Sequence, residues 1–419
     1  MATVENSKKA WFVWGIAGLF YFYQFILRAS PNVMADQLMD AFAIQATSFG
    51  FLASCYYWTY TLLQIPVGVL LDHYGPKAIL RVAVLLCSGG VLLFAVADHF
   101  WLAVLGRTLI GAGAASAFLG TVRLSTLWFS PAHLAVVVGL TVTLGKMGGV
   151  FANYPLTMLV DAMNWRGSMA LLSLIGFGIS ALVWLFVRNG PKDQLGYQKG
   201  GHETWRDVWV SFKEVLTIPN VWWVALYGAL MYTPLTVFTD VWGLSFLTHV
   251  HGMDSGTASL GVTMILVGCA VGAPLIALFS DSVRGRWIPM ALSAFLSLAS
   301  TAILIWAPSL SLTLSFVLMF FMGLFMTGQT LIFIAACEKL PPHMSGMAIG
   351  VVNTVVMLGG VVFQPLVGSI LDILWKGESL GCLRLYSASD YRWALSIIPI
   401  SIGIACLGML RIQETYPKP

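Results

Sequence analysis

The fold is decided by the stretch Gly68-Val-Leu-Leu-Asp72-His-Tyr-Gly75-Pro-Lys77-Ala-Ile-Leu-Arg81, which stands between two long apolar segments. A glycine such as Gly68 on a helix face allows a neighbouring helix to approach closely. Asp72 follows at the end of that helix, Gly75 suits a sharp turn, and Lys77 precedes the next apolar segment. This order of residues predicts a short, charged loop at a membrane surface, between two membrane-spanning helices.

The composition of the whole chain supports this interpretation. Of 419 residues, 58% are hydrophobic and only 10% are charged, and the mean hydropathy is +0.84. Soluble domains carry about 25% charged residues, so lipid is the expected surroundings of most of this chain. The net charge of +4 is small and spread between the apolar segments, which argues against nucleic acid as a partner. The expected partners are the lipid bilayer and a small-molecule substrate, and we expect a monomer.

Apolar runs of the length that crosses a bilayer as a helix, about 20 residues, recur along the chain. We place them at residues 11–29, 47–71, 77–97, 101–127, 133–160, 167–188, 221–247, 258–280, 287–307, 312–337, 345–371 and 393–412. The predicted fold class is therefore all-α and integral to the membrane, with twelve transmembrane helices.

Lysine and arginine are distributed unevenly between the loops on the two sides of the membrane. Most lie in the N-terminus, the loop after Asp72, residues 189–218, the Arg284/Arg286 loop, Lys339 and the C-terminal tail. The alternate loops hold only Arg166, Lys376, Arg384 and Arg392. Because cations are retained on the cytoplasmic side, we predict that both termini are cytoplasmic.

The fifth predicted span recurs in the eleventh. At a constant offset, Gly139, Gly148-Gly149, Asn153 and Asp161 correspond to Gly350, Gly359-Gly360, Gln364 and Asp372. The loop after Asp72 is similar to Asp281-Ser-Val-Arg284-Gly-Arg286 in the second half, and Gly111 corresponds to Gly323. Such repeats indicate two pseudo-symmetric six-helix bundles, with a binding site expected between them near the midplane of the membrane.

The bundles are placed at residues 1–188 and 219–419, joined by a cytoplasmic linker at 189–218. The linker is the only long polar stretch, and six of its residues fall on one face of a helix: Trp205, Val208, Trp209, Phe212, Val215 and Leu216. This pattern predicts an amphipathic helix lying in the membrane interface.

Together these features resemble the major facilitator superfamily, the large group of secondary transporters. The Gly68–Lys77 stretch is similar to the loop between its second and third helices, and Gly106-Arg107-Thr-Leu-Ile-Gly-Ala-Gly113 to its fourth-helix arginine motif. The resemblance covers nearly the whole chain and is nearest to the bacterial organic-anion, amino-acid and peptide branches. It implies a multi-pass protein of the bacterial inner membrane whose two halves rock around a central site. The expected gating residues are Gly68, Asp72, Gly75, Lys77, Arg123 and Asp281, with Arg123 pairing with Asp72.

Lys146 is an ionisable residue inside the fifth predicted span. Each such residue carries a penalty of roughly 2.5–3.5 kcal/mol at a helix centre and therefore needs a reason. The repeat counterpart of Lys146 is Met357, so the fold itself does not require a cation there. Lys146 either pairs with a carboxylate or carbonyls inside the bundle or anchors a substrate, and we favour the anchor. Asn153 shares its helix face and is a second candidate.

Arg28 ends the first predicted span, and Tyr21 and Gln24 share its face. The side chain either snorkels to the outer surface or, as its neighbours favour, binds a carboxylate through two nitrogens. The run Tyr23-Gln24-Phe-Ile-Leu-Arg28-Ala-Ser is similar to the first-helix arginine of the organic-anion symporter branch. The resemblance implies that Arg28 binds an anion such as a sugar acid.

The fourth predicted span departs from that branch. Its members, like the lysosomal dipeptide branch, have a glutamate just after a Gly-x-Gly, where this chain has Gly111-Ala-Gly113-Ala-Ala115. Their proton site is therefore not expected here. Arg107 in the same span either faces the cavity or snorkels outward, and the sequence leaves both open.

Asp240 in the seventh predicted span is the candidate for proton coupling or for binding an ammonium group. The alternative is an aspartate at the outer mouth, exposed to water. Neutral polar residues complete the predicted cavity: Tyr56, Tyr60 and Gln64 in the second span, and Gln329, Asn353 and Gln364 in the tenth and eleventh. Amide side chains in spans also serve simply to bridge helices.

No metal-ligand spacing, nucleophile elbow or Walker loop appears in the sequence. We therefore expect neither an enzyme nor a cofactor or metal, and the energy for transport must come from a gradient. The predicted function is proton-coupled import of a small organic anion or zwitterion, namely an amino acid, short peptide, sugar acid or polycarboxylate such as a siderophore. The alternative is a multidrug or metabolite exporter working as a proton antiporter. Such an exporter is expected to carry acidic residues in the first half of the chain. The ionisable residues inside the predicted spans of that half are basic, which argues against this alternative.

Overall fold

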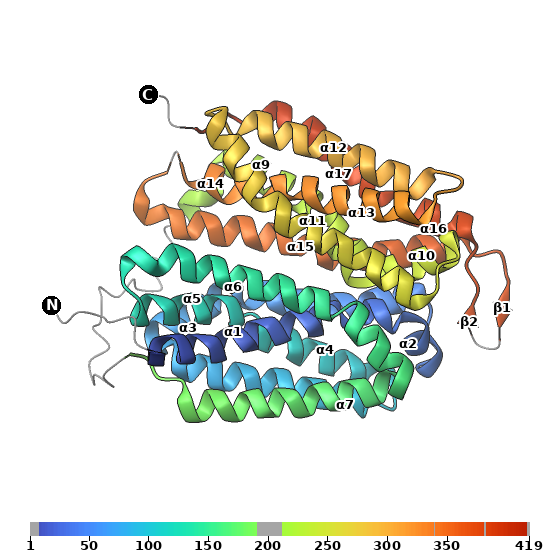
Figure 1. The fold of residues 1–419 in the computed structure, drawn as a ribbon, viewed down its shortest axis with the longest axis horizontal. Coiled ribbons are helices and arrows are strands. Elements are labelled where there is room, and N and C mark those ends of the chain that lie inside the picture. Colours follow the sequence, from blue (N-terminus) through green and yellow to red (C-terminus); the bar gives the residue numbers. More distant parts are fainter. Residues whose placement is uncertain (1–7, 191–211, 339, 381–382, 417–419) are drawn as a thin grey trace. The chain divides into compact units, whose positions relative to one another are not determined.

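The computed structural model describes residues 8–190, 212–338, 340–380 and 383–416. Nearly all of the elements in these ranges are helices (Figure 1). The exception is a hairpin of two antiparallel strands, β1 (Ser379–Leu380) and β2 (Leu383–Arg384), in which Ser379 pairs with Arg384. Most of the predicted linker, including most of its amphipathic helix, lies outside the described residues, although residues 212–216 are helical.

The chain divides into two compact units. Unit 1 contains Met1–Leu38 and Cys55–Gly200, and unit 2 contains Met39–Ser54 and Gly201–Pro419. The division differs from the expected bundles at residues 39–54, which belong to unit 2.

Unit 1 is built around its first helix. Helix α1 (Lys8–Ala29) packs against α4, α5, α6 and α7, and its Phe20 and Leu27 side chains are fully buried. The elements that lie wholly or partly in this unit are α1, η1 (Ser30–Val33), α2 (Ala35–Ala41), α3 (Ala46–Ala95), α4 (Phe100–Ala114), α5 (Ala117–Trp128), α6 (Pro131–Phe151) and α7 (Tyr154–Phe186).

Unit 2 is organised around α9, which packs against α14, α15 and α17. Proline stands at the first helical position of α9 and α15, where its missing N–H is not needed. The elements are α9 (Pro219–Met231), the π-helix η2 (Pro234–Trp242), α10 (Gly243–His251), α11 (Ser255–Ser282), α12 (Trp287–Trp306), α13 (Leu312–Met326), η3 (Thr327–Thr330), α14 (Leu331–Cys337), α15 (Pro342–Leu374), the β1–β2 hairpin, α16 (Ala388–Leu395), α17 (Ile397–Gly408) and η4 (Met409–Arg411).

The predicted membrane spans are found in these helices. Within the described residues, ten helical stretches are long and apolar enough to cross a membrane. The pair Ala35–Ala41 and Ala46–Leu71, bent by 111°, makes eleven. One stretch, Val136–Phe186, has 51 residues, far more than the ~20 that one crossing needs. It includes non-helical backbone at Met163 and Asn164, between the fifth and sixth predicted spans. Each of the twelve predicted spans therefore has a counterpart, and the fold class is confirmed.

The predicted turn after Asp72 forms at Gly75. Its backbone, with φ 78° and ψ 159°, breaks the continuous helix α3, and this conformation favours glycine. The Asn189 side chain accepts a hydrogen bond of 2.8 Å from the Lys77 backbone N–H, which otherwise has no helical partner at a helix start. The side chain of Asp72, and with it the predicted pair with Arg123, lies outside the described residues.

The described structure shows no close helix neighbour at Gly68, and its gating role stays a prediction. A Cβ placed on Gly68 would meet nothing within 4 Å, so this face of α3 is open and no close helix contact requires a glycine there. The turn glycine, rather than the helix-face glycine, is the structurally demanding position of the motif.

The internal repeat appears as equivalent helix contacts inside each unit. In unit 1, a Cβ on Gly148 of α6 would clash with the carbonyl oxygen of Phe22 in α1. In unit 2, a Cβ on Gly359 of α15 would lie only 3.3 Å from the carbonyl oxygen of Ala229 in α9. The sequence correspondence between the two glycines therefore reflects the same close approach of two helices.

The start of α3 belongs to unit 2 because it is bonded there. The Asp372 carboxylate of α15 accepts hydrogen bonds from the backbone N–H and hydroxyl of Thr47, at 2.9 and 2.5 Å. It also accepts from the Tyr386 hydroxyl at 2.5 Å and forms an ion pair of 3.3 Å with Arg384. A carboxylate at a helix N-terminus is stabilised by the helix dipole, so Asp372 holds the first turn of α3.

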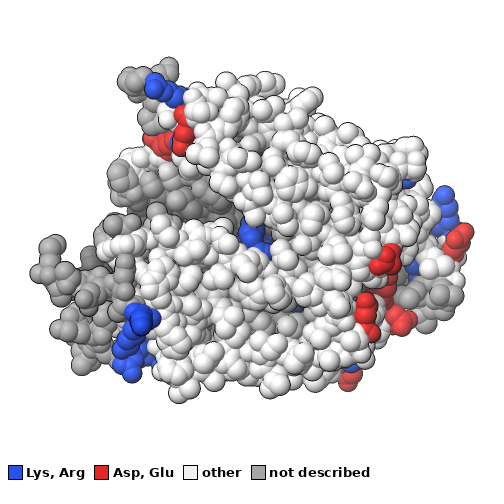
Figure 2. Space-filling model, viewed as in Figure 1, with Lys and Arg blue, Asp and Glu red and all other residues white. Residues whose placement is uncertain are grey.

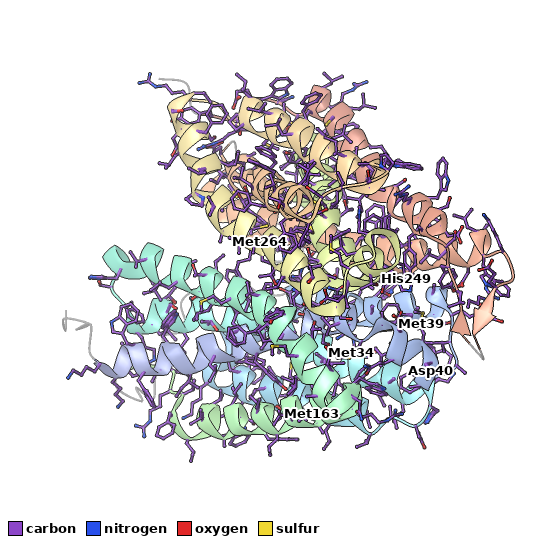
Figure 3. All side chains as sticks on the ribbon, turned by 45° about the vertical axis from the view of Figure 1, so that its right-hand side comes forward. Met34, Met39, Asp40, Met163, His249 and Met264 are labelled. Atoms are coloured by element: carbon purple, nitrogen blue, oxygen red, sulfur yellow. The ribbon has the colours of Figure 1, made fainter. Side chains whose placement is uncertain are left out.

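Most of the charged side chains visible in Figure 2 lie toward the helix ends, and the visible middle of the helices shows only a small cationic patch. In unit 1, Lys77 and Arg188 share one end, because both neighbour Asn189 in space or sequence. The opposite end carries Asp98 beside the Ala97 carbonyl, which accepts a hydrogen bond from Arg166. In unit 2, Asp40 and His249 lie toward the end that carries the β1–β2 hairpin (Figure 3).

Candidate functional site

Arg28 lies in the last turn of α1 and is buried, with 5% of its surface exposed. Its guanidinium carbon lies 5.1 Å from the centre of the Phe25 ring and 5.3 Å from that of Tyr57. Two aromatic faces stabilise the charge and restrict its orientation. Because the side chain is enclosed by protein, the snorkelling alternative for Arg28 is wrong.

Arg107 of α4 holds the end of α1. Its two terminal nitrogens donate hydrogen bonds to the carbonyl oxygens of Leu27 at 2.7 Å and Arg28 at 3.4 Å. The last carbonyls of a helix have no donor within the helix, so Arg107 supplies donors to them, alongside the Ser30 hydroxyl, which also donates to the Leu27 carbonyl at 2.9 Å. With 1% of its surface exposed, it does not snorkel outward, and it fixes the backbone that carries Arg28.

The polar residues predicted around Arg28 are brought together in unit 1. The Tyr56 hydroxyl donates a hydrogen bond of 2.6 Å to Gln24 Oε1, and the Tyr60 ring stacks on Tyr56 with centroids 5.8 Å apart. Tyr21 packs edge-on against Phe25, at 5.2 Å. The end of α1 and residues 56–60 of α3 thus form a cationic, aromatic and amide-containing cluster.

Lys146 of α6 is partly buried and makes no hydrogen bond or ion pair with any residue that the structure describes. The residue before it, Gly145, faces α1, where a Cβ would lie 2.5 Å from the Tyr21 ring. The described residues thus supply no carboxylate or carbonyl partner for Lys146.

Asn153 lies at the break between α6 and α7 and is fully buried. Its Oδ1 accepts a hydrogen bond of 3.1 Å from Asn32 Nδ2, and its own Nδ2 donates to the Gly149 carbonyl at 2.9 Å. The side chain therefore bridges η1 and α6, which is the helix-bridging role that the sequence left open for buried amides.

Asp240 of unit 2 lies in the π-helix η2 and is 3% exposed. The alternative of a water-exposed aspartate is therefore wrong. Gln364 of α15 reaches the same segment: its side-chain Nε2 donates to the Thr236 carbonyl at 2.8 Å, and its backbone carbonyl accepts from Trp242 Nε1 at 3.1 Å. π-helical turns often occur at functional sites. The π-helical segment η2, which carries Asp240, is therefore a candidate functional segment of unit 2.

The remaining predicted polar residues are dispersed along unit 2. Gln329 is buried in the 3₁₀ segment η3, and Asn353 is partly buried on α15. Asn353 precedes Gln364 on the same helix by about three turns. No described contact brings Gln329 or Asn353 to Asp240.

The Asp281 loop forms a charged cluster at one end of unit 2. Arg286 bonds to Asp281 and to Glu338, each at 2.9 Å, as expected for a charged turn. Glu414 accepts hydrogen bonds from the backbone N–H groups of Arg286 and Trp287, at 2.9 and 3.1 Å. Partial burial acts to raise the pKa of Glu414, but these donors and two more backbone N–H groups outweigh it and hold that pKa below its ordinary value.

Several contact residues were missed by the sequence analysis. Phe25 and Tyr57 flank Arg28, Asn189 caps the turn at Gly75, and Asn32 pairs with Asn153. Only the contact of Phe25 with Arg28 could have been predicted, because residues three apart on a helix face the same side. The others come from distant elements, and spacing within one span does not indicate them.

Within the described residues, neither a metal centre nor an apolar cavity in unit 1 offers an alternative site. Among the described residues, no group of three or more His, Cys, Asp or Glu side chains is placed to hold a metal ion. A cavity of about 230 Å³ in unit 1 is lined by aliphatic and aromatic side chains of α1, α6 and α7, including Leu19, Phe151 and Ile175. It lacks the polar groups that an anion requires.

Comparisons with known proteins bear on the family and the fold of this chain. A sequence model of the Major Facilitator Superfamily matches residues 16–364. The probable sulfoacetate transporter SauU of Cupriavidus necator is 23% identical over 67% of this chain and 67% of its own length. The probable galactarate/D-glucarate transporter GudP of Bacillus subtilis is 21% identical over 99% of this chain and 96% of its own length.

The fold is also found in solved structures. A bacterial homologue of the human lysosomal transporter Spinster, in an inward-facing and unoccupied conformation, matches with a TM-score of 0.79 and 17% identity. The match covers 97% of this chain and 98% of the other. At this level of identity the likeness concerns the fold alone.

Proposed function

The chain belongs to the Major Facilitator Superfamily and is a multi-pass membrane transporter, and we propose that its substrate is a small organic anion bound by Arg28. The observation that carries the proposal is the enclosure of this guanidinium between the Phe25 and Tyr57 rings inside a membrane span. An arginine remains charged in such surroundings and binds a carboxylate or sulfonate through parallel hydrogen bonds. The names of SauU and GudP, which refer to organic anions, support the same class.

Lys146 adds a second cation to the proposed site. Lys146 is partly buried and has no partner among the described residues, and its repeat counterpart is the apolar Met357. Two cations suit a dicarboxylate, or an anion with a carboxylate and a sulfonate, better than an anion of single charge.

The proposal includes proton-coupled import, with both termini in the cytoplasm of a bacterial cell. Asp240 is the proposed proton carrier, because it is a buried carboxylate on an irregular helix. The orientation is supported by the lysine- and arginine-rich end of unit 1, which holds Lys77 and Arg188.

Ligand-dependent thermal stability of the purified full-length protein tests the substrate class. A ligand that binds only the folded state stabilises it, by about 2.7 kcal/mol at one hundred times its Kd. We expect D-glucarate or sulfoacetate to raise Tm, and dipeptides and lipophilic cations to leave it unchanged. The gain should shrink in Lys146→Met, which imitates Met357, and persist in the control Lys9→Met at the exposed start of α1.

Two results would contradict the proposal. Stabilisation by lipophilic cations alone would favour an exporter. A full response of Lys146→Met to the anions would remove Lys146 from the site.

A further inference from the structure

Two buried polar side chains on α3 have unpaired oxygens. Thr61 and Gln64 are 5% and 7% exposed, and neither Thr61 Oγ1 nor Gln64 Oε1 has a hydrogen-bond partner among the described residues. An unpaired polar atom away from water destabilises the folded state. Such atoms therefore call for a partner that is not one of the described side chains or backbone groups.

Thr61 differs from the other buried threonines of unit 1. The hydroxyls of Thr121, Thr141 and Thr157 each bond to the carbonyl four residues earlier in their own helices, at 2.7 to 3.0 Å. This return to the helix backbone is the usual way to satisfy a threonine inside a span. The Thr61 hydroxyl does not make that bond.

The two side chains lie on the face of α3 that reaches Arg28. Tyr57, Thr61 and Gln64 are spaced by four and three residues and so form one helical stripe. The Tyr57 ring contacts the Arg28 guanidinium at 5.3 Å. Along the helix axis, Thr61 lies about 6 Å and Gln64 about 10 Å beyond Tyr57. A short-chain anion held at Arg28 would extend along this stripe.

We propose that Thr61 and Gln64 form a hydroxyl subsite, which selects organic anions that carry hydroxyl groups along their chain. This inference rests on the proposed function of Arg28. A substrate hydroxyl can donate to Gln64 Oε1, and the Thr61 hydroxyl can both donate and accept. An anion without hydroxyls leaves both protein groups unpaired, and sites that are built to bond a hydroxyl strongly reject analogues that lack it.

The test compares D-gluconate with hexanoate, which have the same number of carbons and the same charge. Their dissociation constants are measured by titration calorimetry on the purified full-length protein. We expect the wild type to bind D-gluconate at least ~10-fold more tightly. Thr61→Val and Gln64→Leu should each weaken D-gluconate binding by about 10-fold and leave hexanoate unchanged, and Thr61→Ser should keep the preference.

Thr143→Val provides the matched control. Thr143 is exposed on α6 and bonds to the Gly139 carbonyl of its own helix at 3.0 Å. The same chemical change is thereby made away from the stripe. This variant should retain the wild-type ratio of the two dissociation constants.

Stability of the ligand-free variants gives an independent readout. Thr61→Val and Gln64→Leu remove unpaired buried groups, so each should melt at or above the wild-type Tm. A fall in Tm for both would show that these side chains support the fold, and would overturn the subsite.

The outcomes separate the subsite from the proposed function. If the wild type binds neither D-gluconate, hexanoate nor the other anions of the panel, both proposals fall. If it binds the two anions equally, or if the variants change both affinities alike, the anion site stands and the hydroxyl subsite is overturned.

Discussion

Arg107 donates hydrogen bonds to two carbonyls in the last turn of α1, those of Leu27 and Arg28, and the Ser30 hydroxyl also donates to Leu27. Replacement by methionine keeps much of the volume but leaves the buried Leu27 carbonyl without its 2.7 Å bond. We expect Arg107→Met to lower the free energy of unfolding by about 1–3 kcal/mol, measured by thermal unfolding in detergent.

Arg166→Met is the matched control for Arg107→Met. Arg166 also donates to a backbone carbonyl, that of Ala97 at 2.9 Å, but it is exposed. Water can replace its bond, so its loss should change stability by less than about 0.5 kcal/mol. Equal losses in the two variants would show that the burial of Arg107 does not matter.

The residues around Arg28 were partly predictable from the sequence. Tyr21 and Gln24 share its helix face, and the spacing alone places them together. The direction of Arg107 was not predictable, because spacing gives the face of a helix and not the neighbour that lies there. The pairing of Asn153 with Asn32 was missed for the same reason.

At the scale of helices, Glu414 caps the start of α12. Its pKa is held below the ordinary value of about 4.3, so the ionised form is stabilised in the folded state. Its contribution to stability is fully present above the unfolded pKa and is lost as the pH falls through the lower folded pKa.

We therefore expect the wild type to lose more stability than Glu414→Gln when the pH falls below about 4.3, as judged by Tm. The control Glu378→Gln changes an exposed carboxylate near the hairpin and should keep the wild-type pH dependence. Parallel curves for the wild type and Glu414→Gln would contradict the capping role.

Helix breaks differed in how well the sequence indicated them. Gly75 followed by Pro76 is a local turn signal, and the turn formed as predicted. The π-helix η2 and the capping of α3 by Asp372 depend on contacts between distant segments, and no local pattern revealed them. Gly68 shows the converse, because a helix-face glycine does not by itself require a close neighbour.

For the whole molecule, the proposed role of Asp240 separates exchange from accumulation. Asp240→Asn keeps the shape of the side chain and removes its carboxylate, so proteoliposomes should still exchange labelled for unlabelled anion. Uphill accumulation driven by a pH gradient should fall at least ~10-fold, if the carboxylate carries the proton. The control Asp254→Asn alters an exposed N-cap of α11, and unchanged accumulation in Asp240→Asn would assign the coupling elsewhere.

The architecture was the most predictable level. Apolar runs of spanning length and the repeat between the fifth and eleventh spans specified the helical membrane fold, because a bilayer requires each span to be long, apolar and helical. The association of residues 39–54 with unit 2 was not predictable, since it depends on Thr47 and Asp372, which are far apart in sequence.

We propose that the buried Arg28 binds an organic anion for transport. The most direct test of this proposal is uptake of labelled D-glucarate into proteoliposomes containing the wild type or Arg28→Lys. Lysine keeps the charge but loses the planar fork and its stacking between Phe25 and Tyr57. We predict saturable uptake by the wild type, competed by sulfoacetate, and at least ~10-fold less uptake by Arg28→Lys at the same protein content. Equal uptake by the two proteins, or uptake of lipophilic cations in place of anions, would contradict the account.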